Sequence, residues 1–444
     1  IDGEAADDQS GYSVSMSADG NRVAIGAKYN DGNGNQSGHV RIYENNGGVW
    51  VQIGNDIDGE SVNDMSGTSV SLSSDGNAVA IGAPGNGPQS GSVRIYNYNG
   101  SSWTKVGQDI SGESAGDHSG YSVSMSADGN RVAIGALGNA NGNGISGHVR
   151  IYNWDGSSWI QIGQDIDGEA HADESGYSVS LSSDGNTVAI GAPGNNNGNG
   201  NSAGHVRVYN WDGSSWIQIG QDIDGEATND GSGSSVALSS NGNTLAIGAP
   251  WNGSGYVKIY NWVGSSWIQI GQNINGIGND QHLGYSVALD SNGSTVAISS
   301  DWSQLTRIYR FYNASWNQLG NDIIELAGGA PPFGDEVWSV SLSSHGNTVS
   351  IGAPNNDGNG YNSGHVRVFS VGQYTSPPCS GCTDSLAVNY DPYSLIDDGT
   401  CDYLGCTDSL AFNYDPLATI DDSSCIATVY GCMDSTQFNY DATA

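Results

Sequence analysis

The sequence predicts an all-β protein: a seven-bladed β-propeller with four-stranded blades, followed by small disulfide-stapled repeats at the C-terminal end. Two observations indicate the propeller. Each of seven copies holds four short apolar runs separated by clusters of Gly, Asn, Asp and Ser, which is typical of strands joined by tight turns. A Ser-Val pair recurs at intervals of 51 to 57 residues, with its valine at Val14, Val70, Val123, Val179, Val236, Val287 and Val340.

The first copy shows the expected strands in order. The first strand, at 11–17, alternates Tyr12, Val14 and Met16 with serines, as a half-buried strand does. The second reads Val-Ala-Ile-Gly-Ala in most copies, and its small residues predict a close approach of backbones at the propeller centre. The remaining expected strands lie at 22–27, 39–43 and 49–53.

A tryptophan begins the fourth strand in six copies. We expect these rings to pack between neighbouring blades; a ring of sugar-stacking tryptophans is the alternative. The six residues are Trp50, Trp103, Trp159, Trp216, Trp267 and Trp316.

The seventh copy has no such tryptophan after its third strand, which ends near Val371. Three explanations of the missing strand remain open: it precedes Ile1 in a longer chain, 372–375 form a degenerate strand, or another molecule donates a strand by β-augmentation. The chain begins with Ile1 and breaks off inside a tail repeat, so we expect it to be processed or part of a longer protein.

Charge and composition narrow the function classes. The formal charge is −35 with only 12 Lys plus Arg, so polyanions are repelled and nucleic acid is a poor partner. There is no run of 18 apolar residues, so we expect no membrane span. The 67 glycines and the clustered cysteines indicate a secreted, cell-surface protein, and the acidity suits cation binding.

One face of the propeller is expected to carry function. Antiparallel strands place the fourth-to-first and second-to-third connections on one side, and these are the longer and more variable loops. We expect acidic residues of this face to contact a partner; calcium binding and a hydrated acidic surface are the alternatives. They are Asp58, Glu60, Asp64, Asp167, Glu169, Asp173, Asp224, Glu226 and Asp230.

Two loops of that face, 30–35 and 356–361, place oxygen-bearing side chains at alternate positions between glycines. Calcium can use this pattern, although the loops lack the clustered carboxylates of a strong site and a solvated turn is the alternative. The expected ligands are Asp31, Asn33, Asn35, Asp357 and Asn359.

Histidines open the third strand of four copies, and basic residues recur two positions later. Histidines spaced one per blade are too far apart to share a metal, so we expect them to cover neighbouring strands. We expect the basic residues to pair with carboxylates of adjacent blades. A GxGxxG string at 142–147 lacks a following helix, and no other catalytic motif occurs in the propeller, so the sequence predicts no enzyme. The residues concerned are His39, His148, His205 and His365, and Arg41, Arg94, Arg150, Arg207, Lys258 and Arg367.

The segments 10–14, 23–27 and 38–43, with their later copies, resemble the FG-GAP repeat of integrin α-subunit propellers. The resemblance covers about 370 residues, recurs seven times, and implies an extracellular adhesion or ligand-binding propeller. Ser10 stands where the family has Phe, and a tight turn replaces the family's Asp-rich loop. The resemblance therefore implies no calcium at that family position.

All six cysteines lie in the tail, so we divide the chain into a propeller (1–371), a linker (372–380) and Cys-rich acidic repeats (381–444), the third incomplete. A unit of about 24 residues cannot bury a core, which predicts covalent staples. We expect disulfides Cys382–Cys401 and Cys406–Cys425. The alternative joins sequence neighbours: Cys379 with Cys382, Cys401 with Cys406, and Cys425 with Cys432.

Carboxylates and asparagines also recur in the tail, so one calcium per repeat is expected, whereas the cysteine spacings do not repeat a zinc pattern. The repeats resemble acidic Cys-rich repeats near the C-terminal ends of secreted bacterial surface proteins, particularly of marine Bacteroidota. The expected ligands are Asp384, Asn389, Asp391, Asp397, Asp398, Asp408, Asn413, Asp415, Asp421 and Asp422.

Together these patterns predict a non-enzymatic extracellular protein for adhesion or structural assembly of a cell surface or filament. Its propeller would be the interaction platform and its tail a stapled stalk. Expected partners are a protein or glycan on a surface and further copies of the chain, including one that donates the missing strand. A carbohydrate-binding propeller or a glycan-active propeller enzyme is the alternative.

Overall fold

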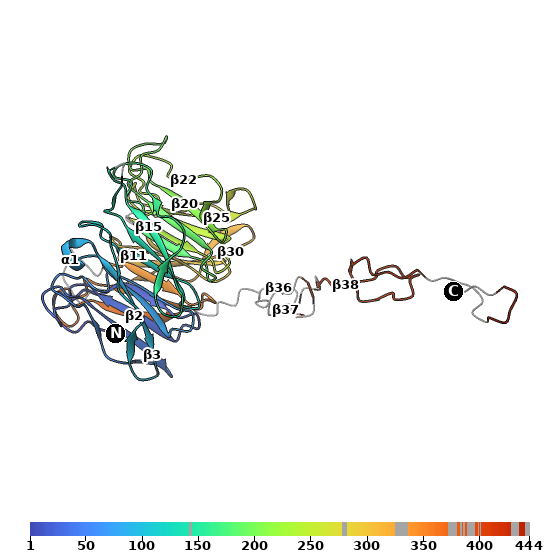
Figure 1. The fold of residues 1–444 in the computed structure, drawn as a ribbon, viewed down its shortest axis with the longest axis horizontal. Helices are drawn as coiled ribbons and strands as arrows, with labels where there is room; N and C mark the ends of the chain where they lie inside the picture. The colour runs from blue at the N-terminus through green and yellow to red at the C-terminus, as the bar shows by residue number, and fades with distance from the viewer. Residues whose placement is uncertain are drawn as a thin grey trace. The chain divides into compact units, whose positions relative to one another are not determined.

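The computed structural model has two units, Ile1–Gly372 and Gln373–Ala444, and nearly all of the regular elements among its described residues are strands. The residues it describes are 1–141, 144–277, 282–324, 336–371, 380–381, 384, 387–388, 396–397, 399, 401–427 and 435–439. The first unit is the predicted seven-bladed propeller, with strands of successive blades following one another around a centre (Figure 1). Among the described residues, no helix is both long and apolar enough to cross a membrane.

Each of the first six blades is an antiparallel sheet of four strands, with a short fifth strand paired to the beginning of the third. Blade one contains β1 (Ser10–Met16), β2 (Arg22–Ala27), β3 (His39–Asn46), β4 (Val49–Gln52) and β5 (Ile57–Asp58). Blade two contains β6 (Ser69–Leu72), β7 (Ala78–Ala83), β8 (Ser92–Tyr98), β9 (Trp103–Lys105) and β10 (Ile110–Ser111), with the short α1 (Asn86–Gln89) in a loop. Blade three contains β11 (Ser122–Met125), β12 (Arg131–Ala136), β15 (His148–Trp154), β16 (Trp159–Gln161) and β17 (Ile166–Asp167), and a loop pairs β13 (Ala140–Asn141) with β14 (Gly144–Ile145).

The later blades repeat this plan. Blade four contains β18 (Ser178–Leu181), β19 (Thr187–Ala192), β20 (His205–Trp211), β21 (Trp216–Gln218) and β22 (Ile223–Asp224). Blade five contains β23 (Ser235–Leu238), β24 (Thr244–Ala249), β25 (Tyr256–Trp262), β26 (Trp267–Gln269) and β27 (Ile274–Asn275). Blade six contains β28 (Leu283–Leu289), β29 (Thr295–Ser300), β30 (Leu305–Tyr312), β31 (Ser315–Gln318) and β32 (Ile323–Ile324), and blade seven contains β33 (Ser339–Leu342), β34 (Thr348–Ala353) and β35 (His365–Ser370).

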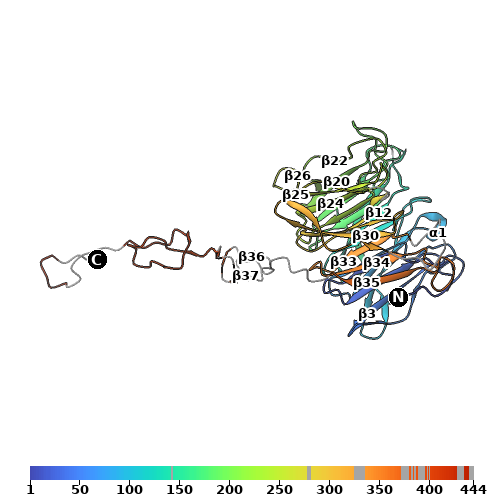
Figure 2. The same ribbon diagram turned by 180° about the vertical axis from the view of Figure 1, so that it is seen from behind.

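The N-terminus closes the ring by pairing with blade seven. Asp2 pairs with His365 in antiparallel register, and the Ile1 amino group donates to the Val366 carbonyl at 2.9 Å. Figure 2 shows the N-terminus beside β35. Ile1 and Asp2 thus occupy in blade seven the place that β5 occupies in blade one. Residues 372–375, one of the three predicted sources of a fourth strand, lie outside the described residues.

Glycines at the centre of the ring confirm the predicted close approach of backbones. At Gly191 of β19, an added Cβ would overlap the carbonyl oxygen of Gly233 in the next blade. The equivalent contacts recur in five other blades, so a side chain at these positions would push neighbouring blades apart. They join Gly26 to Gly67, Gly82 to Gly120, Gly135 to Gly176, Gly248 to Gly284 and Gly352 to Gly11.

The tryptophans of the fourth strands lie between blades, as predicted. Trp216 is 2% exposed, and its indole N–H donates to the Ile162 carbonyl of the preceding blade at 3.0 Å. Trp159, Trp267 and Trp316 are equally buried and make the same contact. These four buried rings cannot stack on a sugar.

The turn between the first and second strands is held by a serine in six blades. In blade four, the Ser182 hydroxyl donates to Asp184 at 2.6 Å and accepts the Thr187 amide N–H at 2.9 Å. Blade six has Asp290 instead, which is 3% exposed and accepts the Thr295 amide N–H at 2.9 Å. Burial raises the pKa of Asp290 above its ordinary value.

We expect Asp290→Ser to stabilise the propeller at pH 7 by about 1 kcal/mol, a typical size for one buried substitution. A carboxyl with a raised pKa binds its proton more tightly in the folded chain. Its ionisation therefore lowers the free energy of unfolding as pH rises from the unfolded pKa through the folded one. The advantage of serine should shrink as pH falls toward 4. Thermal melts of both proteins between pH 4 and 8 check this; a gain that does not depend on pH would contradict the explanation.

In the second unit, two parallel strand pairs accompany the Cys-rich repeats: β36 (Ser380–Gly381) with β37 (Ile396–Asp397), and β38 (Leu404–Gly405) with β39 (Ile420–Asp421). The predicted disulfide Cys406–Cys425 is present, which excludes the pairing of sequence neighbours at these two cysteines. Cys401 is also disulfide-bonded, while its predicted partner Cys382 lies outside the described residues.

Candidate functional site

A cavity of about 130 Å³ lies at the centre of the ring, surrounded by the beginnings of the first strands of all seven blades. Each blade contributes the residue two positions before the valine of its Ser-Val pair, so the cavity lies where these strands begin. This is the face that the sequence predicts to carry function. We call this cavity the channel mouth; its lining residues are Tyr12, Thr68, Tyr121, Tyr177, Ser234, Tyr285 and Trp338.

Aromatic rings dominate the channel mouth and touch in pairs. The rings of Tyr121 and Tyr177 are 5.2 Å apart, those of Tyr12 and Trp338 are 5.0 Å apart, and Tyr285 lies 5.9 Å from Trp338. Burial raises the pKa of each of these tyrosines, so their hydroxyls stay protonated and can donate hydrogen bonds. The mouth therefore combines flat apolar faces with hydrogen-bond donors.

One cation lies among these rings. The Lys28 ammonium is 3.4 Å from the centre of the Tyr12 ring, 4.6 Å from that of Tyr29 and 5.6 Å from that of Trp338. The residue is only 9% exposed, and burial lowers its pKa to about 7. Aromatic faces attract the charged form, so a protonated Lys28 can be held here although desolvation disfavours it.

Acidic groups stand near the same rings. Burial raises the pKa of Glu174. The negative charges of Glu174 and Asp301 add to the effect of burial in raising the pKa of Tyr177. His282 Nδ1 lies 2.8 Å from Asp301 Oδ1, and Glu336 accepts the indole N–H of Trp338 at 3.0 Å. The described residues near the mouth thus include Lys28, His282 and several acids.

Residues that precede the first strands adopt strained backbone conformations beside the mouth. Each lies three positions before a lining residue and has a left-handed φ between 55° and 67°. Such angles disfavour residues other than glycine and cluster at functional sites. The five residues are Gln9, Met65, His118, Glu174 and His282.

The predicted interaction residues divide into three groups by burial. Asp58, Asp167 and Asp224 are exposed. The half-exposed Glu60, Glu169 and Glu226 pair with the third-strand basic residues Arg94, Arg207 and Lys258, which is the pairing expected of those cations.

The third group is buried and closes its own loops. Asp64, Asp173 and Asp230 are each 1% exposed. Asp173 Oδ2 accepts the amide N–H groups of Glu169 and Ala170 at 3.0 and 2.8 Å, and the other two residues repeat this arrangement. These carboxylates are therefore not available on the surface.

Side chains of the two predicted calcium loops bind neighbouring backbone. Asp31 and Asp357 accept the amide N–H groups of Gln36 and Asn362 at 2.7 and 2.8 Å. The amides of Asn33 and Asn359 donate to the carbonyls of Gly59 and Gly3, and Asn35 is exposed. Calcium at these loops stays a prediction.

The described acids of the tail accept short-range hydrogen bonds at turns. Asp408, Asp415, Asp421 and Asp422 each accept an amide N–H two residues on, and Asn413 binds Ile426 and Ser424. Asp384 accepts the Tyr403 hydroxyl at 2.7 Å. Asn389, Asp391, Asp398 and the side chain of Asp397 lie outside the described residues, and calcium in the tail stays a prediction.

Comparison with known proteins supports the propeller. Residues 2–43 match the family model of the FG-GAP repeat, in line with the resemblance seen in the sequence. Comparison with curated proteins gives no match. The resemblance of the tail to bacterial surface repeats stays a prediction.

Several solved structures share the fold at low sequence identity. They include hydrazine synthase of Kuenenia stuttgartiensis, with 15% identity, a TM-score of 0.53, and coverage of 83% of this chain and 97% of that one. The periplasmic gluconolactonase of Pseudomonas aeruginosa has 16% identity, a TM-score of 0.52, and coverage of 70% and 84%. A Bacteroides uniformis protein assigned as a 6-phosphogluconolactonase has 13% identity, a TM-score of 0.50, and coverage of 71% and 85%.

The prediction that this chain is not an enzyme is contradicted by these neighbours, because two of them bear the names of lactonases. The prediction rested on the absence of short catalytic motifs. A propeller site is assembled from residues of several blades, so the lack of a contiguous motif does not exclude catalysis. At these identities the likeness itself shows only the fold.

Proposed function

We propose that the propeller is an extracellular recognition domain that binds the terminal sugar of a glycan at the channel mouth, and that this binding attaches the protein to a surface. The ring of aromatic side chains carries the proposal. Apolar faces that stack on a ligand, with a few polar groups that orient it, are the usual features of small-ligand sites. The cavity is smaller than the roughly 300–1,000 Å³ of drug-sized sites, which favours one sugar unit with the rest of the glycan outside.

Charge favours an uncharged, hydroxyl-rich ligand. The net charge of −35 repels anions at long range, whereas a neutral sugar meets no such barrier. Disulfide Cys406–Cys425 supports an extracellular location, because disulfides persist mainly in oxidising compartments.

We expect Tyr121→Ala to weaken glycan binding about fivefold or more, since one aromatic contact contributes on the order of 1 kcal/mol or more. The measurement is a glycan array followed by titration calorimetry on the best ligand. Tyr312→Ala is the matched control, because Tyr312 is 56% exposed at the turn between β30 and β31, on the opposite face. Unchanged binding by a folded Tyr121→Ala protein would contradict the proposal.

A sugar-directed enzyme is the second candidate. It is favoured by the lactonase neighbours together with Glu174 and the His282–Asp301 pair near the mouth. Sugar lactones offered to the full chain separate the two functions. Hydrolysis above the spontaneous rate that disappears in Glu174→Gln would establish an enzyme. Binding without turnover would leave the recognition domain.

A further inference from the structure

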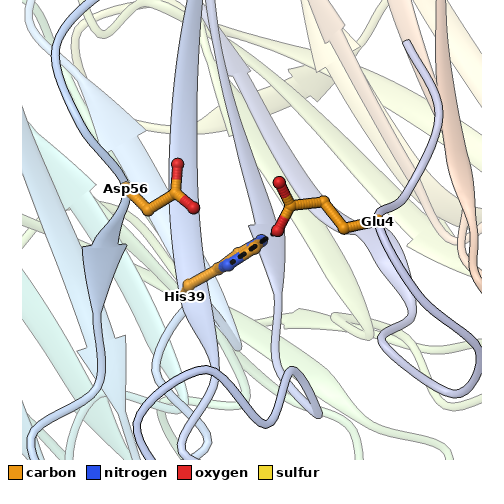
Figure 3. A group of neighbouring side chains, drawn as sticks. All are labelled: Glu4, His39 and Asp56. Atoms are coloured by element: carbon orange, nitrogen blue, oxygen red, sulfur yellow. Dashed lines mark ion pairs between the residues drawn. The ribbon is translucent and has the colours of Figure 1, made fainter.

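Among the described residues, three blades bring a histidine and two carboxylates together at the edge of the third strand. In blade one these are Glu4, His39 and Asp56, whose ligand-capable atoms all lie within 4.8 Å of one another (Figure 3). The histidine comes from β3, and the acids from the segments before β1 and after β4. The same positions form the groups Glu113, His148 and Asp165 in blade three, and Glu169, His205 and Asp222 in blade four. We call these groups the Glu-His-Asp trios.

Neighbouring side chains hold the acids in place. The amide of Gln52 donates to Asp56 Oδ1 at 2.6 Å, and Arg41 contacts Glu4 Oε1 at 3.2 Å. The other Glu4 oxygen lies 4.0 Å from His39 Nδ1. Blades three and four repeat the glutamine bond at 2.6 Å and the arginine contact at 3.4 Å. Groups that orient a ligand in this way are a regular feature of metal sites.

The imidazoles do not bond directly to the acids that surround them. His148 Nδ1 lies 3.9 Å from Asp165 Oδ2, beyond hydrogen-bond distance. His148 Nε2 and His205 Nε2 are buried without a hydrogen-bond partner in the part of the chain that the structure describes. The ring nitrogen that faces the acids is Nδ1, at 4.0 Å from Glu4 in blade one and 3.9 Å from Asp165 in blade three. A neutral imidazole binds a metal through the lone pair of either ring nitrogen.

In blade two, an arginine contacts both acids that correspond to those of a trio, whereas among the described contacts of the trios it pairs with only one. In blade two, Ser92 replaces the histidine, and Arg94 contacts both Glu60 and Asp109, at 3.2 and 3.1 Å. In each trio, an imidazole lies beside the Asp instead. Among the described contacts, the arginine of each trio blade pairs with the Glu and not with the Asp. In the described part of the chain, the carboxylates of each trio therefore outnumber the guanidinium groups that contact them.

We propose that each Glu-His-Asp trio is a binding site for Zn²⁺. One imidazole nitrogen and two carboxylate oxygens form a donor set that zinc accepts. The glutamates are about half exposed, with Glu4 at 46%, so the fourth position of a tetrahedral ion is open to water. Each site binds its own ion, because each lies in a different blade. This inference is independent of the proposed glycan binding.

The chain itself supplies the matched variant. Blade five carries Asn273 where the trios have Asp, and Asn273 still accepts the hydrogen bond of its glutamine, Gln269, at 2.8 Å. Asp56→Asn, Asp165→Asn and Asp222→Asn should therefore keep the local fold while removing one charged ligand each. Asp322→Asn is the control, because Asp322 has the same position in blade six, where Leu305 replaces the histidine and Arg307 binds the acid at 2.9 Å.

The experiment is equilibrium dialysis of the full, oxidised chain against micromolar Zn²⁺ with millimolar Ca²⁺ present to occupy sites made only of carboxylates. Each trio variant should bind about one equivalent of zinc less than the parent, and the triple variant about three less. Asp322→Asn should lose none. His148→Asn, checked by its melting temperature, should lose the same equivalent as Asp165→Asn.

Equal zinc content in the parent and the triple variant would overturn the proposal and leave the trios occupied by water. The proposal would also be overturned if the parent and the variants differed in bound zinc only when Ca²⁺ is absent. The trios would then bind cations only as exposed carboxylates do. A loss in Asp322→Asn equal to that in the trio variants would show that the histidine is not a ligand.

Discussion

Gly191→Ala should destabilise the propeller by about 3 kcal/mol or more, the upper end of what overpacking costs, because the new methyl group would overlap a backbone carbonyl. That carbonyl belongs to Gly233 in the next blade and cannot rotate away as a flexible side chain would. Relief of the overlap requires two blades to separate, which disturbs packing on both sides. Chemical denaturation of the parent and the variant measures the change.

Gly198→Ala is the matched control for this substitution. No atom lies within 4 Å of a Cβ built at Gly198, and its φ is not in the left-handed region. The control should therefore change the free energy of unfolding by less than about 1 kcal/mol. Equal stabilities of the two variants would show that neighbouring blades are not in contact through these glycines.

Trp216→Ala should cost about 3–5 kcal/mol, the usual range for removing a large buried aromatic side chain. The ring fills space between blades three and four, where Ile162 and Tyr209 belong to its cluster, and its N–H would no longer satisfy the Ile162 carbonyl. Ile217→Ala is the control, because Ile217 is the next residue and is 50% exposed. A loss below 1 kcal/mol in Trp216→Ala would contradict the interblade role. Glycan binding by the folded fraction should stay unchanged.

The blade architecture could be predicted because its determinants are local and repeated. The alternation of Tyr12, Val14 and Met16, the small residues of the second strand and the turn dipeptides each occur within a few residues, and seven copies reinforce them. The packing of the tryptophans between blades could be predicted because each begins an apolar strand, where a large ring is most stable when it is buried. The disulfide Cys406–Cys425 was found from its spacing.

The channel mouth could not be predicted in this way. The residue that each blade contributes to the lining differs in type, as in Tyr12, Thr68, Ser234 and Trp338. Each of them alone has the pattern of an ordinary half-buried strand position. Only closure of the ring brings the seven together. Lys28 was missed for the same reason, since nothing near it in sequence marks it as a buried cation. The signal in the sequence is the position two before the Ser-Val valine, which is aromatic in five of the seven copies.

The neighbours of the histidines and the burial of three loop acids could not be predicted, for a different reason. The repeat pattern relates His39 to the histidines of other blades, whereas the residues beside it are Glu4 and Asp56, 35 and 17 positions away in the chain. Asp173 reads as a surface acid in a polar loop. Its carboxylate instead turns back to the amide N–H groups of residues 169 and 170, which a charge pattern does not reveal.

Closure of the ring by Ile1 and Asp2 determines how the propeller responds to mechanical tension. The first residues of the propeller and its last strand, β35, lie in one blade and run antiparallel, with Ile1 beside Val366. Tension that pulls on both ends of the propeller therefore peels this seam from one end, breaking its hydrogen bonds one after another. The six complete blades lie outside that load path until the seam has opened. Blade seven is thus the part of the ring that yields first to force.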